Sequence, residues 1–254
     1  MKVLCWNVNG IRSVAKKGFD ETVLHLDPDI VCLQETRINS DEDIVPLPGY
    51  NARFVHSNLR GRNGVAIYVK DNTPISYSPF QVQESFAEEG RVQMLLLGKV
   101  LLINAYYPSS QGTQEGLKRR IKWNWEFNGY VKFLRSRYPV ILCGDLNVAI
   151  DRPDLSIPRN NTFIPGCSRE ERYLFEMLIR DGMVDIWRAL NPATIQPTWW
   201  SNIGNVPSKN FGYRLDYFLV DERLVMRVRS IAILSDIQGS DHCPLMLQIS
   251  TDCF

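Results

Sequence analysis

The stretch VQMLLLGKVLLINAYY, residues 92–107, contains two apolar runs separated by Gly98-Lys99. Each run has the length of a strand, and Gly98-Lys99 is a plausible hairpin turn between them. Two strands joined by a tight turn are neighbours in one antiparallel sheet. A doubly wound parallel sheet would place a helix between consecutive strands, so this stretch favours a different architecture.

Similar apolar runs that end in polar residues recur along the chain. They predict further strands at residues 2–8, 29–35, 64–70, 139–148, 214–220, 230–236 and 244–250. Helices are expected at 18–27, 114–137 and 168–181, the last opening with Ser168 and Glu171 at the spacing of a capping box. Because several strands follow one another without a helix, we expect a four-layered α/β sandwich, in which two packed β-sheets are flanked by helices.

Length and composition are those of an ordinary globular protein. The chain has 254 residues, of which 44% are hydrophobic and 22% are charged. No repeat, low-complexity tract or Pro- or Ser-rich linker marks a boundary, so a single domain over residues 1–254 is expected. The opening MKVLCWNVNG has too short an apolar stretch for a signal peptide, and no run is long enough to span a membrane. We therefore expect a cytoplasmic protein in a prokaryote, or a nuclear one in a eukaryote.

The net charge of +1 neither indicates nor excludes a nucleic-acid partner, since a groove can be basic in a balanced chain. Basic residues do cluster locally, at Arg60 with Arg62, at Lys118–Lys122, and at Arg223, Arg227 and Arg229. Solvated surface charge is the default interpretation of each cluster alone. The six cysteines show no CxxC spacing. Cys5, Cys32 and Cys143 stand in apolar runs and are expected to be buried, in a protein of a reducing compartment.

Polar side chains stand at the ends of several predicted strands. They are Asn7, Asn9, Glu35, Tyr106, Asp145, Asn147, Asp216, Asp241 and His242. Taken singly, Asn and Asp after a strand are ordinary turn residues, and a lone histidine is more often structural. Glu35 is harder to explain in this way, because a charge at the end of an apolar strand is costly if it is buried and unpaired. Together the set indicates metal-assisted hydrolysis with Mg²⁺ on carboxylate oxygens, and no Cys/His constellation supports zinc.

A resemblance to a known family adds to this interpretation. The segments that carry it are WNVNGIR (6–12), DIVCLQET (29–36), GVAIY (64–68), EGRVQ (89–93), AYYP (105–108), CGDLNVA (143–149), TWWS (198–201), GYRLDYFL (212–219) and GSDHCP (239–244). In this order they resemble the exonuclease III family of abasic-site (AP) endonucleases, part of the endonuclease/exonuclease/phosphatase superfamily. The similarity extends from Lys2 to Ser250. GDLNVA and GSDHCP are specific in combination.

The resemblance implies roles for the residues that match. His242 would contact the scissile phosphate, and Asp216 would orient it. Asp145 would activate or orient the attacking water, or assist the leaving oxygen. Asn147 would hydrogen-bond the phosphate, and Tyr106 would stabilise its charge.

Metal and DNA contacts follow from the same resemblance. Glu35 would be the principal ligand of Mg²⁺, for which Mn²⁺ may substitute, with Asn7 and Asn9 beside it and Asp241 as a further candidate ligand. The residues expected to bind DNA or the abasic site are Arg91, Asn161, Trp199, Ile203, Tyr213 and Leu215. The implied enzyme is a monomer that acts on double-stranded DNA with abasic or damaged sites.

The implied reaction is cleavage of the phosphodiester 5′ to an abasic site, with secondary 3′-to-5′ exonuclease and 3′-end-cleaning activity. The chain departs from the family pattern at Asn9, Arg37, Ser109 and Ile164. One alternative is a relative that hydrolyses another phosphoester, such as an RNA deadenylase, a retroelement-type endonuclease or an inositol-phosphate phosphatase. TWWS and GYRLDYF argue against it. The other is a non-catalytic nucleic-acid-binding protein, which could dispense with Glu35, Asp145 or His242.

Overall fold

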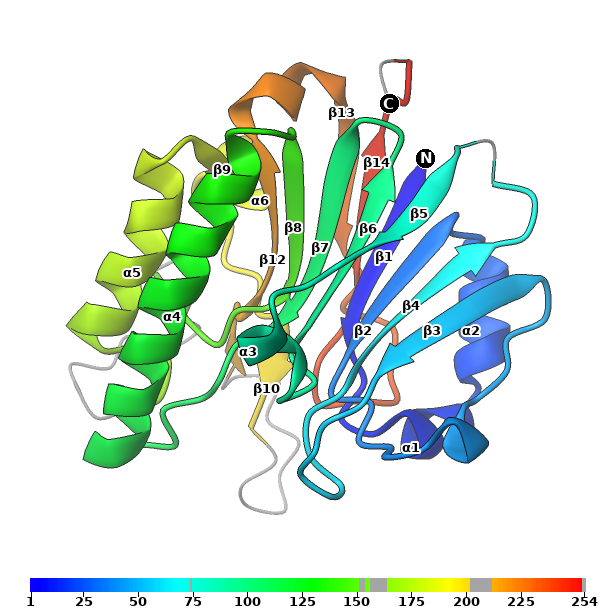
Figure 1. Ribbon diagram of the computed structural model, residues 1–254, viewed down its shortest axis with the longest axis horizontal. Coiled ribbons are helices and arrows are strands. Elements are labelled where there is room, and N and C mark those ends of the chain that lie inside the picture. The colour runs from blue at the N-terminus through cyan, green and yellow to red at the C-terminus, as the bar shows by residue number, and fades with distance from the viewer. Residues whose placement is uncertain (74, 151–153, 156–163, 202–211, 253–254) are drawn as a thin grey trace.

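Two six-stranded β-sheets pack face to face in the computed structural model, which describes residues 1–73, 75–150, 154–155, 164–201 and 212–252 (Figure 1). The first sheet has the order β13 (Val228–Ile233), β14 (Leu245–Ile249), β1 (Lys2–Asn7), β2 (Ile30–Gln34), β4 (Val65–Lys70) and β3 (Tyr50–Val55). The second has the order β5 (Tyr77–Phe80), β6 (Val92–Leu97), β7 (Val100–Tyr106), β8 (Val140–Asp145), β12 (Asp216–Asp221) and β9 (Met183–Asp185). A two-stranded ribbon joins β10 (Trp199–Trp200) and β11 (Gly212–Tyr213).

The hairpin expected at Gly98-Lys99 is present. Strands β6 and β7 pair antiparallel with Leu97 opposite Val100, and Gly98 has a φ of 57°, a value that glycine adopts without a steric cost. Every predicted strand range overlaps an observed strand, and the expected four-layered architecture is confirmed. Strands β3, β5, β9, β10 and β11 were not predicted. They are short or lie at sheet edges, and β5 contains Pro79, so their sequences lack a long apolar run.

Helices cover the outer face of each sheet (Figure 1). Helices α1 (Ile11–Ala15) and α2 (Phe19–Leu26) pack on the first sheet, and α4 (Gln114–Arg135) and α5 (Arg169–Arg180) pack on the second. Helix α5 starts with the predicted capping box, in which Ser168 Oγ accepts from Glu171 N at 3.1 Å and Glu171 Oε2 accepts from Ser168 N at 3.1 Å. None of the described helices is long and apolar enough to cross a membrane.

Short helical turns complete the described part of the chain. They are α3 (Glu84–Ala87), α6 (Ile186–Leu190) and the 3₁₀ turns η1 (Asp41–Asp43) and η3 (Glu222–Arg227). Neither these turns nor α1 were predicted, because a segment of one or two turns shows no helical periodicity in its sequence.

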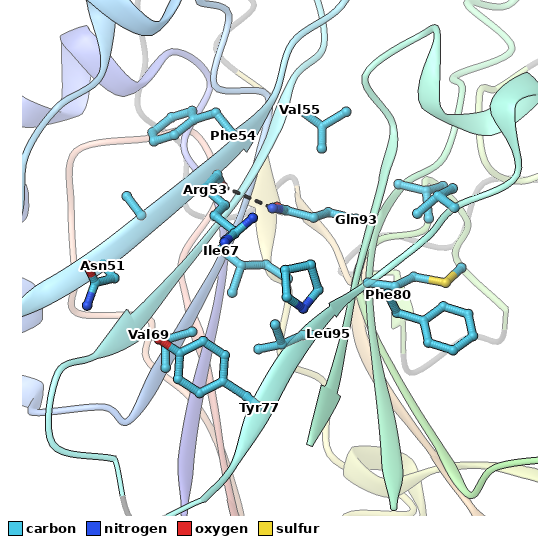
Figure 2. Close-up of a pocket in the computed structure, with 15 residues that line it drawn as sticks. Asn51, Arg53, Phe54, Val55, Ile67, Val69, Tyr77, Phe80, Gln93 and Leu95 are labelled. Carbon is cyan, nitrogen blue, oxygen red and sulfur yellow. Dashed lines mark hydrogen bonds between the residues drawn. The ribbon is translucent and has the colours of Figure 1, made fainter. Parts of the chain in front are cut away.

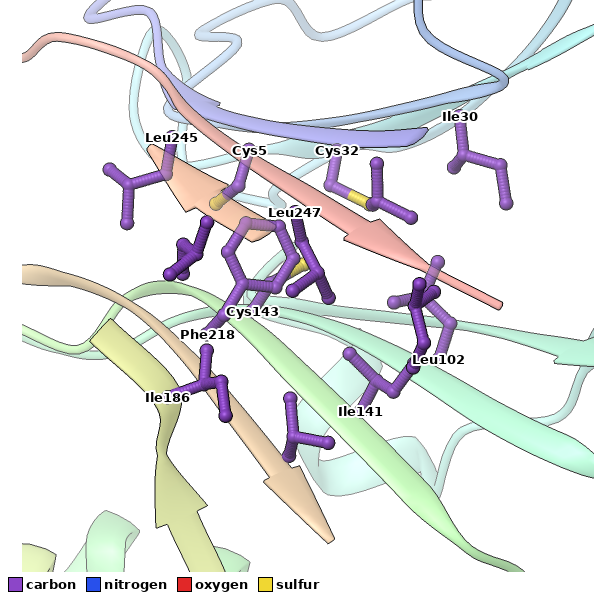
Figure 3. Packing of buried hydrophobic residues seen from close by; sticks show 14 of the residues in the cluster. Cys5, Ile30, Cys32, Leu102, Ile141, Cys143, Ile186, Phe218, Leu245 and Leu247 are labelled. Atoms are coloured by element: carbon purple, nitrogen blue, oxygen red, sulfur yellow. The ribbon is translucent and has the colours of Figure 1, made fainter. Parts of the chain in front are cut away.

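The main core lies between the sheets (Figure 3). In β8, Ile141 and Cys143 point into this core, whereas Val140 and Leu142 belong to the cluster under the helices. Phe218 on β12 is fully buried between the sheets, and burying a side chain of this size contributes about 1.5–3 kcal/mol relative to leaving it in water. The expected burial of Cys5, Cys32 and Cys143 is confirmed, and all three are free thiols.

A cleft of about 690 Å³ opens at one edge of the sandwich, where the edge strands β3 and β5 do not meet (Figure 2). Gln93 on β6 reaches across it, and its Nε2 donates to the carbonyl of Arg53 on β3 at 3.1 Å. The cleft is lined by strands β3 to β6 and by none of the polar residues predicted at the strand ends. It is therefore separate from the site described next.

Candidate active site

The predicted polar residues meet because of the strand directions. Strands β1 and β2 are parallel, as are β7 and β8, so both pairs of strands bring their carboxyl ends together. Strand β12 is antiparallel to β8, and this places Asp216 at its start opposite Asp145 at the end of β8. The two sheets are joined at this end, because Asn7 Nδ2 on β1 donates to Asp145 Oδ2 on β8 at 2.9 Å. The convergence inferred from the strand ends is therefore observed.

Three of the predicted residues have a left-handed backbone: Asn9 with φ 47°, Glu35 with φ 51° and Asn147 with φ 49°. Asparagine tolerates this region, but glutamate adopts it rarely, so strain is concentrated at the end of β2. Two backbone hydrogen bonds hold the turn, from Gly10 N to the carbonyl of Glu35 at 2.7 Å and from Thr36 N to the carbonyl of Gly64 at 3.0 Å. With this backbone conformation the side chain of Glu35 faces the other site residues, and its Oε1 accepts a hydrogen bond from Asn7 Nδ2 at 3.1 Å.

His242 and Asp216 form a buried pair. His242 Nδ1 lies 2.8 Å from Asp216 Oδ2, and both side chains are at most 5% exposed. Burial by itself lowers the pKa of His242, but the carboxylates of Asp216, Asp145 and Asp241 outweigh it and raise the pKa well above the usual value. The imidazole is therefore protonated at neutral pH, and its Nε2 faces Asp145 Oδ2 at 3.9 Å.

Asp145 accepts hydrogen bonds from two asparagines of the site, Asn7 and Asn147. Asn147 donates to it twice, from its backbone N to Oδ1 at 2.9 Å and from Nδ2 to Oδ2 at 3.2 Å. Burial raises the pKa of Asp145; the positive His242 opposes this shift, while the negative Asp216 and Glu35 add to it. The pKa of this carboxyl consequently lies above the ordinary range of aspartate. Such a group can accept or donate a proton near neutral pH.

Asn147 was expected to donate to the phosphate. That contact stays a prediction, and in this structure Asn147 Nδ2 donates to the carbonyl of Tyr107 at 3.0 Å and to Asp145. Because an amide nitrogen has two protons, both donors are used within the protein. In this structure Asn147 therefore holds Asp145.

Arg91 lies beneath Tyr106 and not on the surface. It is 5% exposed, its Nε donates to Glu89 Oε2 at 2.5 Å, and its guanidinium carbon lies 5.0 Å from the centre of the Tyr106 ring. In this structure Arg91 contacts Glu89 and Tyr106, and its expected contact with DNA stays a prediction. Burial, together with Glu35 and Asp145, raises the pKa of Tyr106, so its phenol keeps the proton and remains a hydrogen-bond donor.

The oxygens expected to hold a cation lie around Asn7. Glu35 Oε2 accepts from Arg37, Asn9 N donates to Asn7 Oδ1 at 3.0 Å, and Asn9 Nδ2 donates to Asp241 Oδ1 at 2.7 Å. Asn9 Oδ1 is buried and has no hydrogen-bond partner among the described residues, so its lone pairs are available. An all-oxygen set with such an unsatisfied atom suits a hard cation such as Mg²⁺.

A second group of possible ligands consists of Asp145, Asp216 and His242, whose ligand atoms lie within 4.8 Å of one another. The hydrogen bond of His242 to Asp216 and its approach to Asp145 account for the closeness of these ligand atoms without a metal ion.

Trp199, Tyr213 and Leu215 gather beside His242. The rings of Trp199 and Tyr213 stack at 5.7 Å, and Trp199 Nε1 donates to Asp241 Oδ2 at 3.1 Å. Leu215 is 7% exposed and packs in a small cluster with Leu155. Their sequence positions therefore do bring these three residues to the candidate site. Asn161 and Ile203 lie outside the described residues.

Three residues that support the site were not singled out from the sequence. Thr198 Oγ1 accepts from the backbone N of Leu215 at 2.9 Å and of Asp216 at 3.1 Å. Ser240 Oγ donates to the carbonyl of Asn7 at 2.8 Å, and Trp6 Nε1 donates to the carbonyl of His242 at 2.9 Å. Each residue stands inside a motif quoted above. The motif does not reveal which of its members holds the others in place.

Comparison with known proteins finds similar sequences that extend over almost the whole chain. The endonuclease/exonuclease/phosphatase family matches residues 4–242. The DNA-(apurinic or apyrimidinic site) endonuclease of Dictyostelium discoideum is 38% identical over 96% of this chain and 69% of that protein. The exodeoxyribonuclease of Bacillus subtilis is 35% identical over 98% of this chain and 100% of that protein.

Solved structures share the fold. The AP endonuclease LMAP of Leishmania major superimposes with a TM-score of 0.90 at 28% identity, over 98% of this chain and 87% of that one. The 3′-5′ exonuclease NExo of Neisseria meningitidis gives a TM-score of 0.85 at 23% identity, over 99% of this chain and 100% of that one, and supports the fold alone.

Proposed function

The chain belongs to the endonuclease/exonuclease/phosphatase family, and we propose that it is a Mg²⁺-dependent DNA repair enzyme that hydrolyses the phosphodiester 5′ to an abasic site. The observation that carries the proposal is the contact between two sets of residues. The buried His242–Asp216 pair faces Asp145, and the ring of Trp199, which stacks on Tyr213, lies 6.5 Å from the ring of His242. A 3′-to-5′ exonuclease and a 3′-end-cleaning activity would be secondary.

The chemistry needs no covalent intermediate with the protein. A water oxygen bonds to phosphorus and the P–O3′ bond breaks, which leaves a 3′-hydroxyl and a 5′-phosphate on the abasic sugar. Protonated His242 and the phenol of Tyr106 would donate hydrogen bonds to the phosphate oxygens as negative charge builds on them. Asp145, whose pKa is raised, would take the proton of the water or give one to the leaving O3′.

The cation would be held by Glu35, with Asn7, Asn9 and Asp241 beside it, and Mn²⁺ would substitute for Mg²⁺. Support comes from the oxygen-only donor set and from the unpartnered Asn9 Oδ1. When bound, such an ion supplies positive charge that stabilises the developing charge on the phosphate.

Selectivity for abasic sites would arise beside His242. A nucleotide without a base loses little stacking when it leaves the duplex. The half-buried rings of Trp199 and Tyr213 and the side chain of Leu215 offer an apolar surface to the bare sugar. Two relatives are an apurinic or apyrimidinic site endonuclease and an exodeoxyribonuclease by name, which supports DNA as the substrate, and we propose that this DNA is double-stranded. We propose that the enzyme acts as a monomer.

The test is cleavage of a 5′-labelled duplex that contains one synthetic abasic site, with Mg²⁺ and with EDTA, beside an intact duplex. We expect Mg²⁺-dependent cleavage at the abasic site, with a product that a DNA polymerase can extend. Asp145→Asn and His242→Ala should each lower the rate at least ~10²-fold, the scale for losing one positioned group. His25→Ala, at an exposed histidine on α2, is the matched control. Cleavage of both duplexes at equal rates, or full activity of both variants, would contradict the proposal.

A further inference from the structure

Arg37 is tied to Glu35 by a two-donor contact. Its Nε lies 3.0 Å and its Nη2 2.6 Å from Glu35 Oε2. The two residues are only two positions apart, and both have a positive φ, 51° at Glu35 and 56° at Arg37. Buried Thr36 between them anchors the turn, and Arg37 N donates to the carbonyl of Asn63 at 2.9 Å. The strained turn therefore places the guanidinium on the carboxylate.

The two oxygens of Glu35 differ in how firmly their partners are held. Oε1 accepts from Asn7, which is fully buried on β1 and also donates to Asp145. Oε2 accepts from Arg37, whose side chain is 44% exposed, against 14% for that of Glu35. Asn7 is fixed by its surroundings, whereas Arg37 can swing into solvent. A cation that approaches Glu35 therefore meets the positive guanidinium of Arg37 at Oε2 and competes with it for that oxygen.

Other basic residues near the site have partners of their own. Arg91 is paired with Glu89, and Lys17 Nζ donates to the carbonyl of Gly239 at 2.7 Å. Within the described part of the chain, Arg37 is the only ion-pair partner of Glu35. Among the described residues, the charged competitor for this carboxylate is thus Arg37.

We propose that Arg37 is a positioning residue that acts as the internal counter-cation of Glu35. It occupies the outer oxygen of Glu35 before the divalent cation binds, and so raises the cation concentration that the site needs. This inference rests on the proposed function, in which Glu35 holds the cation. Arginine suits the role because its planar fork engages a carboxylate through two N–H groups, whereas a lysine at this position would be a single hydrated point charge.

The experiment is a calorimetric titration of the DNA-free protein with MgCl₂ at constant ionic strength, for wild type, Arg37→Met, Arg37→Lys and Arg180→Met. Arg180 forms an exposed ion pair with Glu176 on α5 at 3.2 Å and serves as the matched control. We expect Arg37→Met to lower the Mg²⁺ Kd about two- to five-fold, the range for an exposed ion pair. Arg37→Lys should lower it less, and Arg180→Met should leave it unchanged. Circular dichroism checks that the variants are folded.

A double-mutant cycle with Glu35→Gln tests whether the effect of Arg37→Met on the Mg²⁺ Kd acts through Glu35. Glu35→Gln should raise the Mg²⁺ Kd, because Glu35 holds the cation. In that background Arg37→Met should no longer change the Kd, because the carboxylate for which Arg37 and the cation compete is gone. An unchanged or higher Kd for Arg37→Met in the wild-type background would overturn the inference while leaving the cation site intact. If wild type binds no Mg²⁺ and cleaves abasic duplex equally well in EDTA, the proposed cation site fails, and the role of Arg37 fails with it.

Discussion

At the scale of single residues, the site depends on buried groups whose charge is set by their neighbours. Asp216 is 1% exposed, and one of its oxygens contacts His242 while the other has no hydrogen-bond partner among the described residues. A buried carboxylate with one strong partner stabilises the protonated imidazole. Asp216 is therefore the largest contributor, beside Asp145 and Asp241, to the raised pKa of His242.

We predict that Asp216→Asn narrows the pH range of activity from the alkaline side. The wild-type carboxylate raises the pKa of His242, so the imidazole keeps its proton as the pH rises. Without that negative charge the pKa falls, and His242 becomes neutral at a lower pH. The alkaline limb of kcat/KM for abasic duplex should move to lower pH, as measured by a pH–rate profile. The exposed Asp20→Asn is the control, and an alkaline limb at the wild-type position would contradict the assigned role.

At the scale of elements, charged side chains tie strands to helices away from the site. Asp221 ends β12 and is fully buried. It accepts from Arg135 Nε in the last turn of α4 at 2.8 Å and from Arg223 Nη2 at 2.6 Å. Burial raises the pKa of Asp221, but these hydrogen bonds outweigh it, and the net pKa is lowered. The contact thus links the second sheet to the helix that covers it.

We predict that Asp221→Asn destabilises the protein by about 2 kcal/mol at pH 7, because charge-assisted hydrogen bonds to two arginines are lost. The folded-state pKa lies below the unfolded value of about 4. The stabilisation is therefore fully present above pH ~4 and is lost as the pH falls further. Urea unfolding of wild type and variant at pH 7 and at pH 3 checks this. The difference between them should shrink at pH 3, and a constant difference would show that the charge is not its source.

At the scale of the whole molecule, basic residues that are neighbours in the sequence differ in whether they are exposed or buried. Lys118, Arg119 and Lys122 are exposed on α4, which follows the end of β7 at the candidate site. Arg120 between them is fully buried and donates to the carbonyls of Pro108 and Leu146. Arg120 therefore cannot belong to a basic surface with its sequence neighbours, and only the exposed Lys118, Arg119 and Lys122 can contact DNA.

We predict that affinity for undamaged duplex falls linearly in a plot of log K against log salt, with a slope of about −0.9 per phosphate neutralised. Replacing both Lys118 and Lys122 by alanine should flatten the slope by roughly 1 to 2, because each lysine would neutralise one phosphate at most. Lys99→Ala is the control, since this exposed residue lies in the hairpin at the opposite end of β7 from the site. Equal slopes for the double variant and wild type would assign these lysines to solvated surface.

The sequence by itself determined the central strands, the three longer helices and the family. The central strands are apolar runs of suitable length, and the capping box at Ser168 is a local pattern, so both can be recognised without knowledge of the fold. The edge strands β3 and β5 were not predicted from the sequence. Each pairs with a neighbour on one side only, so its side chains need not form a long apolar run. For the candidate site, the sequence indicated which residues converge, since the ends of strands fall on one edge of the sandwich.

Only the tertiary structure decided what each of those residues contacts. Asn7 and Asp145 are 138 positions apart and His242 and Asp216 are 26 apart, so their hydrogen bonds depend on how separate strands pack. No local sequence pattern predicts that Arg91 and Arg120 are buried. None predicts the ion pair between Arg37 and Glu35 either. Local sequence patterns predict secondary structure because they reflect the backbone preferences of neighbouring residues and the periodicity of their side chains. The charge and contacts of a buried group depend instead on neighbours that the folded chain brings to it from elsewhere.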